Sequence, residues 1–187
     1  MRYLTLLLFA CAAVAAAACG NSTGLQAYID NVVDTVSLYA LSGTPVTKPS
    51  AYSFQSRGVV RTDQAATFDF AFDIDTAGRA VFLSTGAMKL GQLSGLQVAT
   101  QPFDSIRYAP TDNYQLDSAV VVHDSSVVLA HSAQVACGNG FLSVFYAKLR
   151  VLTIDTTATP NGRRIDFQIL ADFNCGFRGL QPGLPNQ

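Results

Sequence analysis

Apolar and polar residues alternate along several short stretches of this chain, and the alternation predicts β-strands. In the clearest stretch, residues 68–75, every even position is large and apolar while every odd position is Asp or Ala. Successive side chains of a strand point to opposite faces, so this stretch is expected to form a half-buried strand with one apolar face. Residues 76–78 are turn formers and residues 80–83 are again apolar, which predicts a hairpin.

Further strands follow from the same pattern, and turn-rich stretches separate them. Residues 42–50 and 101–116 each contain two prolines and are expected to be loops. About seven to nine short strands with turns between them predict an all-β fold, an antiparallel β-sandwich, with a closed β-barrel as the alternative. The further strands are expected at residues 33–41 and 96–100, in a hairpin of 119–123 with 126–133, and in a longer hairpin of 141–155 with 163–173.

The composition supports this β interpretation. All 13 acidic residues are Asp and none is Glu. Asp competes with the helical backbone for hydrogen bonds, whereas Glu is a good helix former, so the chain is poorly equipped for helices. The formal net charge is −1 and no basic block occurs, so no nucleic-acid partner is expected.

The N-terminal segment has the composition of an export signal. Arg2 provides the positive charge, and residues 3–18 are apolar apart from Thr5, a run shorter than the roughly 20 residues of a membrane span. The segment ends in Ala16-Ala17-Ala18-Cys19-Gly20, which resembles the lipobox of bacterial lipoproteins. The resemblance implies cleavage before Cys19, acylation of that cysteine and attachment to the membrane through the lipid.

Gly20 refines the expected location. The residue after the lipobox cysteine is not Asp, so the usual cue for retention in the inner membrane is absent. In a cell with two membranes, this implies delivery to the outer membrane, facing the periplasm or the cell surface. The alternative is a plain secretory signal that leaves Cys19 as a free thiol on a soluble, secreted or periplasmic protein. The chain is thus expected to divide into a signal peptide (1–18), a tether (19–30), the β-sandwich domain (31–176) and a Gly/Pro-rich surface tail (177–187).

The cysteine count predicts one disulfide. Cys11 lies inside the predicted signal, and the lipobox resemblance assigns Cys19 to acylation. Cys137 and Cys175 then remain to pair in an oxidising compartment.

The register of the last predicted hairpin brings the same two cysteines together. If Asp155 faces Arg163, Cys175 lies opposite Ser143, which is close to Cys137 once residues 138–140 turn. The disulfide is therefore expected to clip the open end of this hairpin.

The loop within residues 103–114 is the best candidate for ligand binding. Arg107, Tyr108 and Tyr114 offer a guanidinium and two aromatic faces among turn residues. Loop tyrosines bind sugars and peptides, but they also close the ends of β-sandwiches, and both interpretations are open.

Other candidate chemistry is weak, so no catalytic residue, metal site or cofactor is expected. Asp73-x-Asp75 resembles a calcium loop but lacks the third carboxylate and the closing Glu. His123 and His131 are expected at opposite ends of a hairpin, too far apart to share a metal. The alternation places the strand aspartates on the solvent face, Asp69 and Asp172 among them.

These observations predict an exported, lipid-anchored β-sandwich that acts as a non-catalytic binding or structural module of the cell envelope. Its partner, a protein or a glycan, is left open. The alternative is a lipocalin-like carrier, a barrel that holds a small apolar ligand. Inward phenylalanines such as Phe70, Phe72 and Phe167 would leave such a carrier little cavity.

Overall fold

A computed structural model describes residues 26–91, 93–137, 140–159 and 161–185. The predicted signal peptide and the acylation site Cys19 lie outside the described residues, as does most of the predicted tether.

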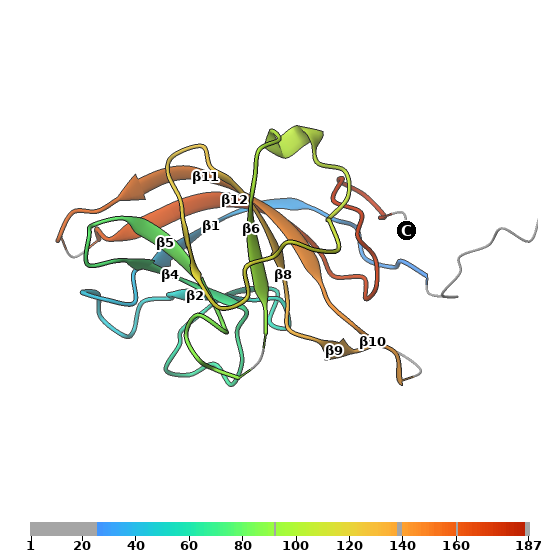
Figure 1. The fold of residues 1–187 in the computed structure, drawn as a ribbon, viewed down its shortest axis with the longest axis horizontal. Helices are drawn as coiled ribbons and strands as arrows, with labels where there is room; N and C mark the ends of the chain where they lie inside the picture. Colours follow the sequence, from blue (N-terminus) through green and yellow to red (C-terminus); the bar gives the residue numbers. More distant parts are fainter. Residues whose placement is uncertain (1–25, 92, 138–139, 160, 186–187) are drawn as a thin grey trace, which may run out of the picture.

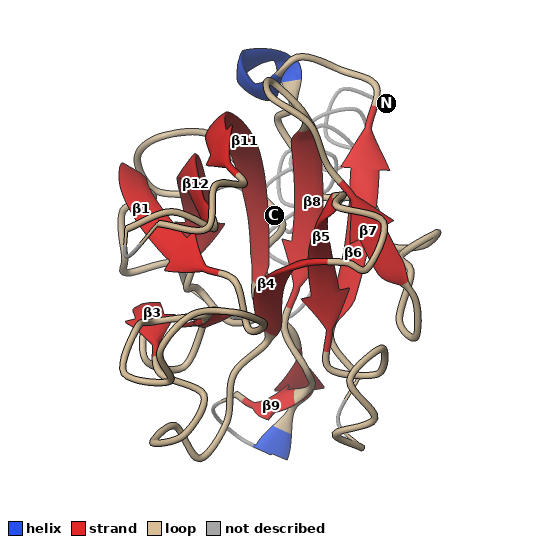
Figure 2. Cartoon of the chain, turned by 90° about the vertical axis from the view of Figure 1, so that its left-hand side faces the viewer, coloured by secondary structure: helices blue, strands red, loops and turns tan. Residues whose placement is uncertain are grey.

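The described residues form an all-β fold of two antiparallel five-stranded sheets, and neither sheet closes into a barrel (Figures 1 and 2). The alternative of a closed barrel is therefore wrong. The first sheet has the order β1-β12-β11-β8-β6, with β1 at Val33–Tyr39, β12 at Arg164–Asp172, β11 at Tyr146–Asp155, β8 at Val127–His131 and β6 at Gly95–Ala99. The second has the order β3-β2-β4-β5-β7, with β3 at Gly58–Val60, β2 at Ala51–Ser53, β4 at Phe70–Ile74, β5 at Ala80–Ser84 and β7 at Ala119–Val121.

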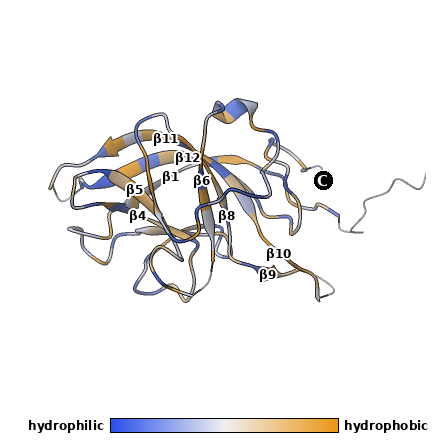
Figure 3. Ribbon diagram, viewed as in Figure 1, coloured by the Kyte–Doolittle hydropathy of each residue, from blue (hydrophilic) through white to orange (hydrophobic). Residues whose placement is uncertain are grey.

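Two short strands and one turn of helix complete the described elements. Strands β9 (Val135–Ala136) and β10 (Leu142–Ser143) form a small hairpin, and η1 (Phe103–Ser105) is a 3₁₀ turn. Hydrophobic residues are concentrated in the strands, and many connecting loops are hydrophilic (Figure 3).

Aromatic rings fill the space between the two sheets. Phe70 and Phe82 of the second sheet have ring centroids 5.5 Å apart, and Phe82 lies 5.6 Å from Phe167 of the first sheet. All three side chains are buried, and edge-to-face contacts of this kind add to the free energy gained by burial. The interior is thus packed with side chains.

The predicted hairpin of residues 68–75 and 80–83 is confirmed. Strands β4 and β5 pair with Phe72 opposite Phe82, and the intervening turn is closed by Asp75. Its Oδ1 accepts hydrogen bonds from the backbone N–H groups of Ala77 (2.9 Å) and Arg79 (2.8 Å). The Asp75 carboxylate therefore stabilises the backbone of the turn. The strands predicted at residues 33–41 and 96–100 correspond to β1 and β6.

The predicted hairpin of residues 119–133 is wrong. Strand β7 pairs with β5 in the second sheet, whereas β8 pairs with β6 and β11 in the first. The chain crosses between the sheets at residues 122–126, so Val120 and Val128 enter the same core from opposite sides. In sequence, a tight turn between two apolar runs looks like a hairpin turn. In the structure the first run pairs with β5 and the second with β6 and β11.

The last predicted hairpin is confirmed with one correction. Asp155 lies opposite Arg164 rather than Arg163, and an irregularity between Val151 and Thr153 shifts the register by one residue. The far end of the hairpin therefore has the register that the sequence predicted.

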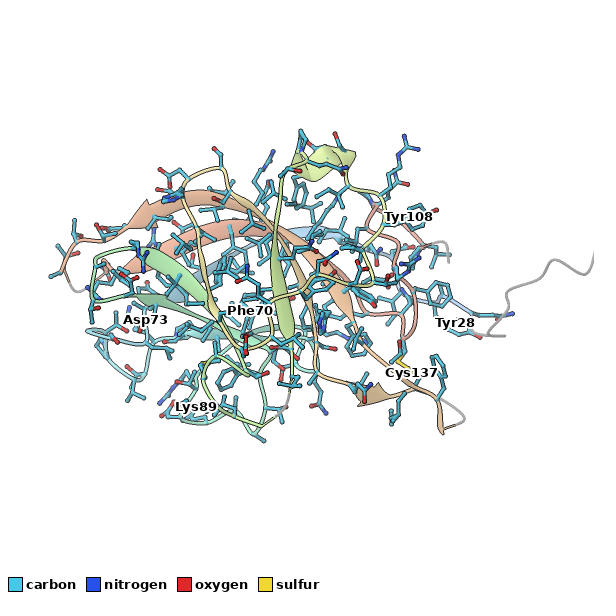
Figure 4. The ribbon with its side chains drawn as sticks, in the orientation of Figure 1. Tyr28, Phe70, Asp73, Lys89, Tyr108 and Cys137 are labelled. Carbon is cyan, nitrogen blue, oxygen red and sulfur yellow. A yellow bond between two sulfur atoms is a disulfide. The ribbon has the colours of Figure 1, made fainter. Side chains whose placement is uncertain are left out.

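The Cys137–Cys175 disulfide is present, with 5.8 Å between the two Cα atoms. It joins the residue that follows β9 to the segment that follows β12 (Figure 4).

A second apolar layer covers the outer face of the first sheet, and the sequence analysis missed it. The layer comes from the segment after β6 and from the C-terminal segment. The side chains in this cluster are Phe103, Ile106, Ala109, Val127, Leu129, Leu170 and Leu180. The tail predicted at residues 177–187 is thus not a free surface tail in its described part, because Phe177 and Leu180 are buried.

Candidate binding groove

The loop that carries the predicted binding residues is attached to the first sheet by a buried lysine. The Nζ of Lys148, on β11, donates hydrogen bonds to the carbonyl oxygens of Phe103 (2.9 Å) and Ile106 (3.0 Å). It also lies 4.5 Å from the centroid of the Phe103 ring. Burial lowers the pKa of Lys148, and the charge of Asp104 opposes that effect. The ammonium group therefore holds η1 at a fixed place above the sheet.

The C-terminal segment fixes the other side of the loop. The N–H of Ala109 donates to the carbonyl of Arg178 (2.9 Å), and the N–H of Leu180 donates to the carbonyl of Arg107 (2.7 Å). Tyr108 forms an antiparallel bridge with Gly179 between these two bonds. Backbone pairing of this kind positions Tyr108 without using its side chain.

A groove of about 540 Å³ runs between this loop and the edge strand β6. Its described lining has no charged side chain. One wall is Tyr108, which is 48% exposed, together with Ile106. The floor and the other wall come from Leu129 of β8 and from Gln97 and Val98 of β6.

Beside the groove, strand β6 presents backbone groups that have no hydrogen-bond partner among the described residues. The N–H and C=O of Leu96 are hydrogen bonded to Gln115, at 3.0 and 2.8 Å. In an antiparallel strand these groups point alternately to either side, so those of Val98 also point away from β8, toward the open edge. Gln97 adds a side-chain Oε1 that is buried and has no hydrogen-bond partner among the described residues.

The three predicted binding residues do not converge. Tyr108 lines the groove, and it shares a smaller hollow of about 100 Å³ with Arg107 and with C-terminal residues such as Gln181 and Leu184. Tyr114 instead packs edge-on against His131, with ring centroids 4.5 Å apart, and its hydroxyl donates to the carbonyl of Pro110 (3.3 Å). Burial raises the pKa of Tyr114. Its side chain supports the fold.

His131 is also held by its surroundings. Its Nδ1 lies 2.8 Å from the carbonyl of Ser132, and a Cβ added to Gly95 would come within 2.2 Å of its Nε2. Burial lowers the pKa of His131, which favours the neutral ring. Across the described residues, no group of three or more His, Cys, Asp or Glu side chains could hold a metal ion.

Two aspartates that the alternation placed toward solvent are buried, which corrects that expectation. Asp69 accepts hydrogen bonds from the N–H groups of Phe54 (2.7 Å) and Ala133 (3.1 Å), and burial raises its pKa. Asp172 is fully buried and accepts from the backbone N–H of Asn174 (2.8 Å). Both carboxylates tie a strand end to a neighbouring segment.

Comparison with known proteins adds no family: no family model, curated protein or solved structure matches this chain. Within the described part of the chain, no helix is long and apolar enough to cross a membrane.

Proposed function

We propose that this protein is an exported, lipid-anchored, non-catalytic binding module of the cell envelope, and that it binds its ligand at the groove beside β6. The export and the anchor rest on the N-terminal segment and on Cys19, whose surroundings resemble a lipobox. The disulfide is consistent with folding in an oxidising compartment.

The ligand class proposed is an extended peptide segment of a protein partner. The observation that carries this proposal is the backbone N–H and C=O of Val98, which have no partner among the described residues and lie on the strand edge that borders the groove. An added strand would hydrogen bond to these groups, and every second side chain would then point toward the groove. Because the described lining is uncharged, the side chain that enters would be apolar or neutral.

The carrier alternative is less well supported. It requires a barrel around an apolar cavity, and the space between the two sheets holds buried rings such as Phe72, Phe82 and Phe167. A small apolar ligand would have to bind at the surface groove instead.

Metabolic labelling with a clickable fatty acid tests the anchor. The full-length protein should be labelled and should fractionate with the outer membrane, whereas the Cys19→Ser variant should carry no label. Labelling that persists in the variant would contradict the anchor.

Selection of random displayed peptides on the purified protein tests the groove. The selected peptides should bind the wild-type protein, and Val98→Pro should weaken them by roughly tenfold or more because it removes the N–H at the free edge. Tyr108→Ala should weaken the same peptides, while Val46→Ser, at a distant exposed site, should not. Equal binding to the Val98→Pro variant would refute strand addition.

A further inference from the structure

Both ends of the described chain lie at the same end of the molecule (Figure 1). Gln26 begins the described residues there, and the backbone of Asn31 exchanges two hydrogen bonds with Gly183, at 2.9 and 3.0 Å. Asn174 also binds the N-terminal segment, because its Oδ1 accepts from the N–H groups of Tyr28 (2.8 Å) and Ile29 (2.9 Å). The N-terminal segment is therefore fixed to the sandwich from residue 28 onward.

Large apolar side chains are exposed on this end. Bonded contacts hold the segments that carry these side chains close together. Asn174 binds the backbone of Tyr28, and its neighbour Cys175 is bonded to Cys137. The N–H of Cys137 in turn donates to the carbonyl of Phe141 (2.7 Å). Figure 4 places Tyr28 and Cys137 at the same end and Asp73 at the opposite one. We define the end face as Tyr28, Val32, Phe141, Leu142 and Leu184, which are between 45% and 79% exposed.

The length of the intervening chain limits how far the end face can lie from an acylated Cys19. Gln26 lies seven positions after Cys19 in the sequence. Even fully extended, a chain of that length spans at most about 25 Å. The lipid on Cys19 would therefore keep the end face within about the thickness of one bilayer from the membrane surface.

We infer that the end face is a second membrane contact, which lies on the lipid surface and orients the sandwich with the opposite end outward. This inference rests on the anchor proposed above. Tyr28 is suited to the headgroup region, where a ring with a polar hydroxyl is partly buried and partly hydrated, and Leu142 and Leu184 are suited to the acyl boundary. The neighbouring exposed charges have both signs, Asp30 and Arg107, so the contact does not require anionic lipid.

Tryptophan reporters test this contact, because the chain contains no tryptophan of its own. The acylated full-length protein is reconstituted in phosphatidylcholine vesicles with or without brominated acyl chains, as the Tyr28→Trp or the Val46→Trp variant. Both sites are exposed, so both variants should fold. Emission from the Tyr28→Trp variant should shift to shorter wavelength and be quenched by the brominated lipid, and emission from the Val46→Trp variant should do neither.

A second arm separates the surface contact from the anchor. The Cys19→Ser chain without residues 1–18, which cannot be acylated and lacks the apolar N-terminal segment, is titrated with the same vesicles with and without added phosphatidylglycerol. Tyr28→Ser with Leu184→Ser should reduce its partitioning by roughly tenfold or more, since two exposed apolar side chains are lost, whereas Val46→Ser with Leu152→Ser should leave it unchanged. Absence of fatty-acid labelling at Cys19 would refute the anchor while leaving this partitioning intact.

Two results would overturn the inference. Equal quenching of the two tryptophan variants would show that the end face does not lie on the lipid. A shift to shorter wavelength that occurs without vesicles, together with a doubled mass, would show that a second copy of this chain covers the end face.

Discussion

The buried carboxylate of Asp172 should make the stability of the protein fall as the pH rises. Asp172 ends β12 and is fully buried. Its Oδ1 accepts hydrogen bonds from the backbone N–H (2.8 Å) and the side-chain Nδ2 (2.9 Å) of Asn174, but its Oδ2 is buried without a partner. Burial, only partly offset by these hydrogen bonds, raises the pKa of Asp172 from 3.8 to about 6.

The sign and the size of the effect follow from proton linkage. Between pH 4 and 6 the folded state holds a proton that the unfolded chain has lost, so the contribution of Asp172 to stability is fully present below pH 4 and is lost as the pH rises to about 6 and above. Each tenfold change in proton affinity corresponds to about 1.4 kcal/mol, so the raised pKa corresponds to about 3 kcal/mol.

The Asp172→Asn variant isolates this contribution, because an amide does not ionise. The free energy of unfolding is measured by urea denaturation from pH 4 to pH 7.5, with circular dichroism as the signal. The difference between the variant and the wild type should move in favour of the variant by about 2.5 kcal/mol across this range, because part of the effect has already occurred at pH 4. Only the change of this difference with pH reports on ionisation. A difference in the free energy of unfolding that is the same at every pH reflects the hydrogen bonds that the new amide makes or loses.

The control variant is Asp112→Asn, which removes the same charge at an exposed site and corrects for the change in net charge. Asp69 and His131 also titrate differently in the folded state, but both proteins share them and their contributions cancel. A difference between Asp172→Asn and wild type that stays flat across the range would refute the reasoning.

Three further changes test other parts of the structure by urea denaturation. Cys137→Ser with Cys175→Ser removes a disulfide that closes a separation of 38 residues, and it should cost about 4 kcal/mol; a loss under about 1 kcal/mol would contradict the chain-entropy account. Lys148→Met should cost about 1–3 kcal/mol and should speed amide exchange in residues 103–110, because two buried carbonyls lose their donor. Gly95→Ala should cost about 1–3 kcal/mol by displacing the His131 ring, whereas Gly58→Ala, which meets nothing within 4 Å, should cost less; equal losses would show that the contact is unimportant.

The sequence alone determined the strand class and much of the pattern of burial. Period-two alternation has one geometric interpretation, since side chains of a strand point alternately to two faces, and residues 68–75 and 163–173 indeed form the strands β4 and β12. The pairing of Cys137 with Cys175 could also be predicted, because only these two cysteines remained once Cys11 and Cys19 were assigned to the N-terminal segment. These features depend on local geometry and on simple counting.

The tertiary structure alone decided which strands pair and which faces are covered. Strands β7 and β8 are separated by a tight turn, yet they belong to different sheets, because each run pairs with a more distant partner. The short strand β2 shows no alternation, since all three of its residues are buried.

The candidate groove also depends on contacts between segments that are far apart in the sequence. Alternation assigns Leu129 and Lys148 to the outer face of a strand, but it does not show that a distant loop covers that face. The covering loop and C-terminal segment bury Lys148 and place Tyr108 beside the open edge of β6, while Tyr114 is drawn into contact with His131. The alternating pattern identified the two faces of each strand, and only the packing of segments far apart in the sequence decided which faces meet water.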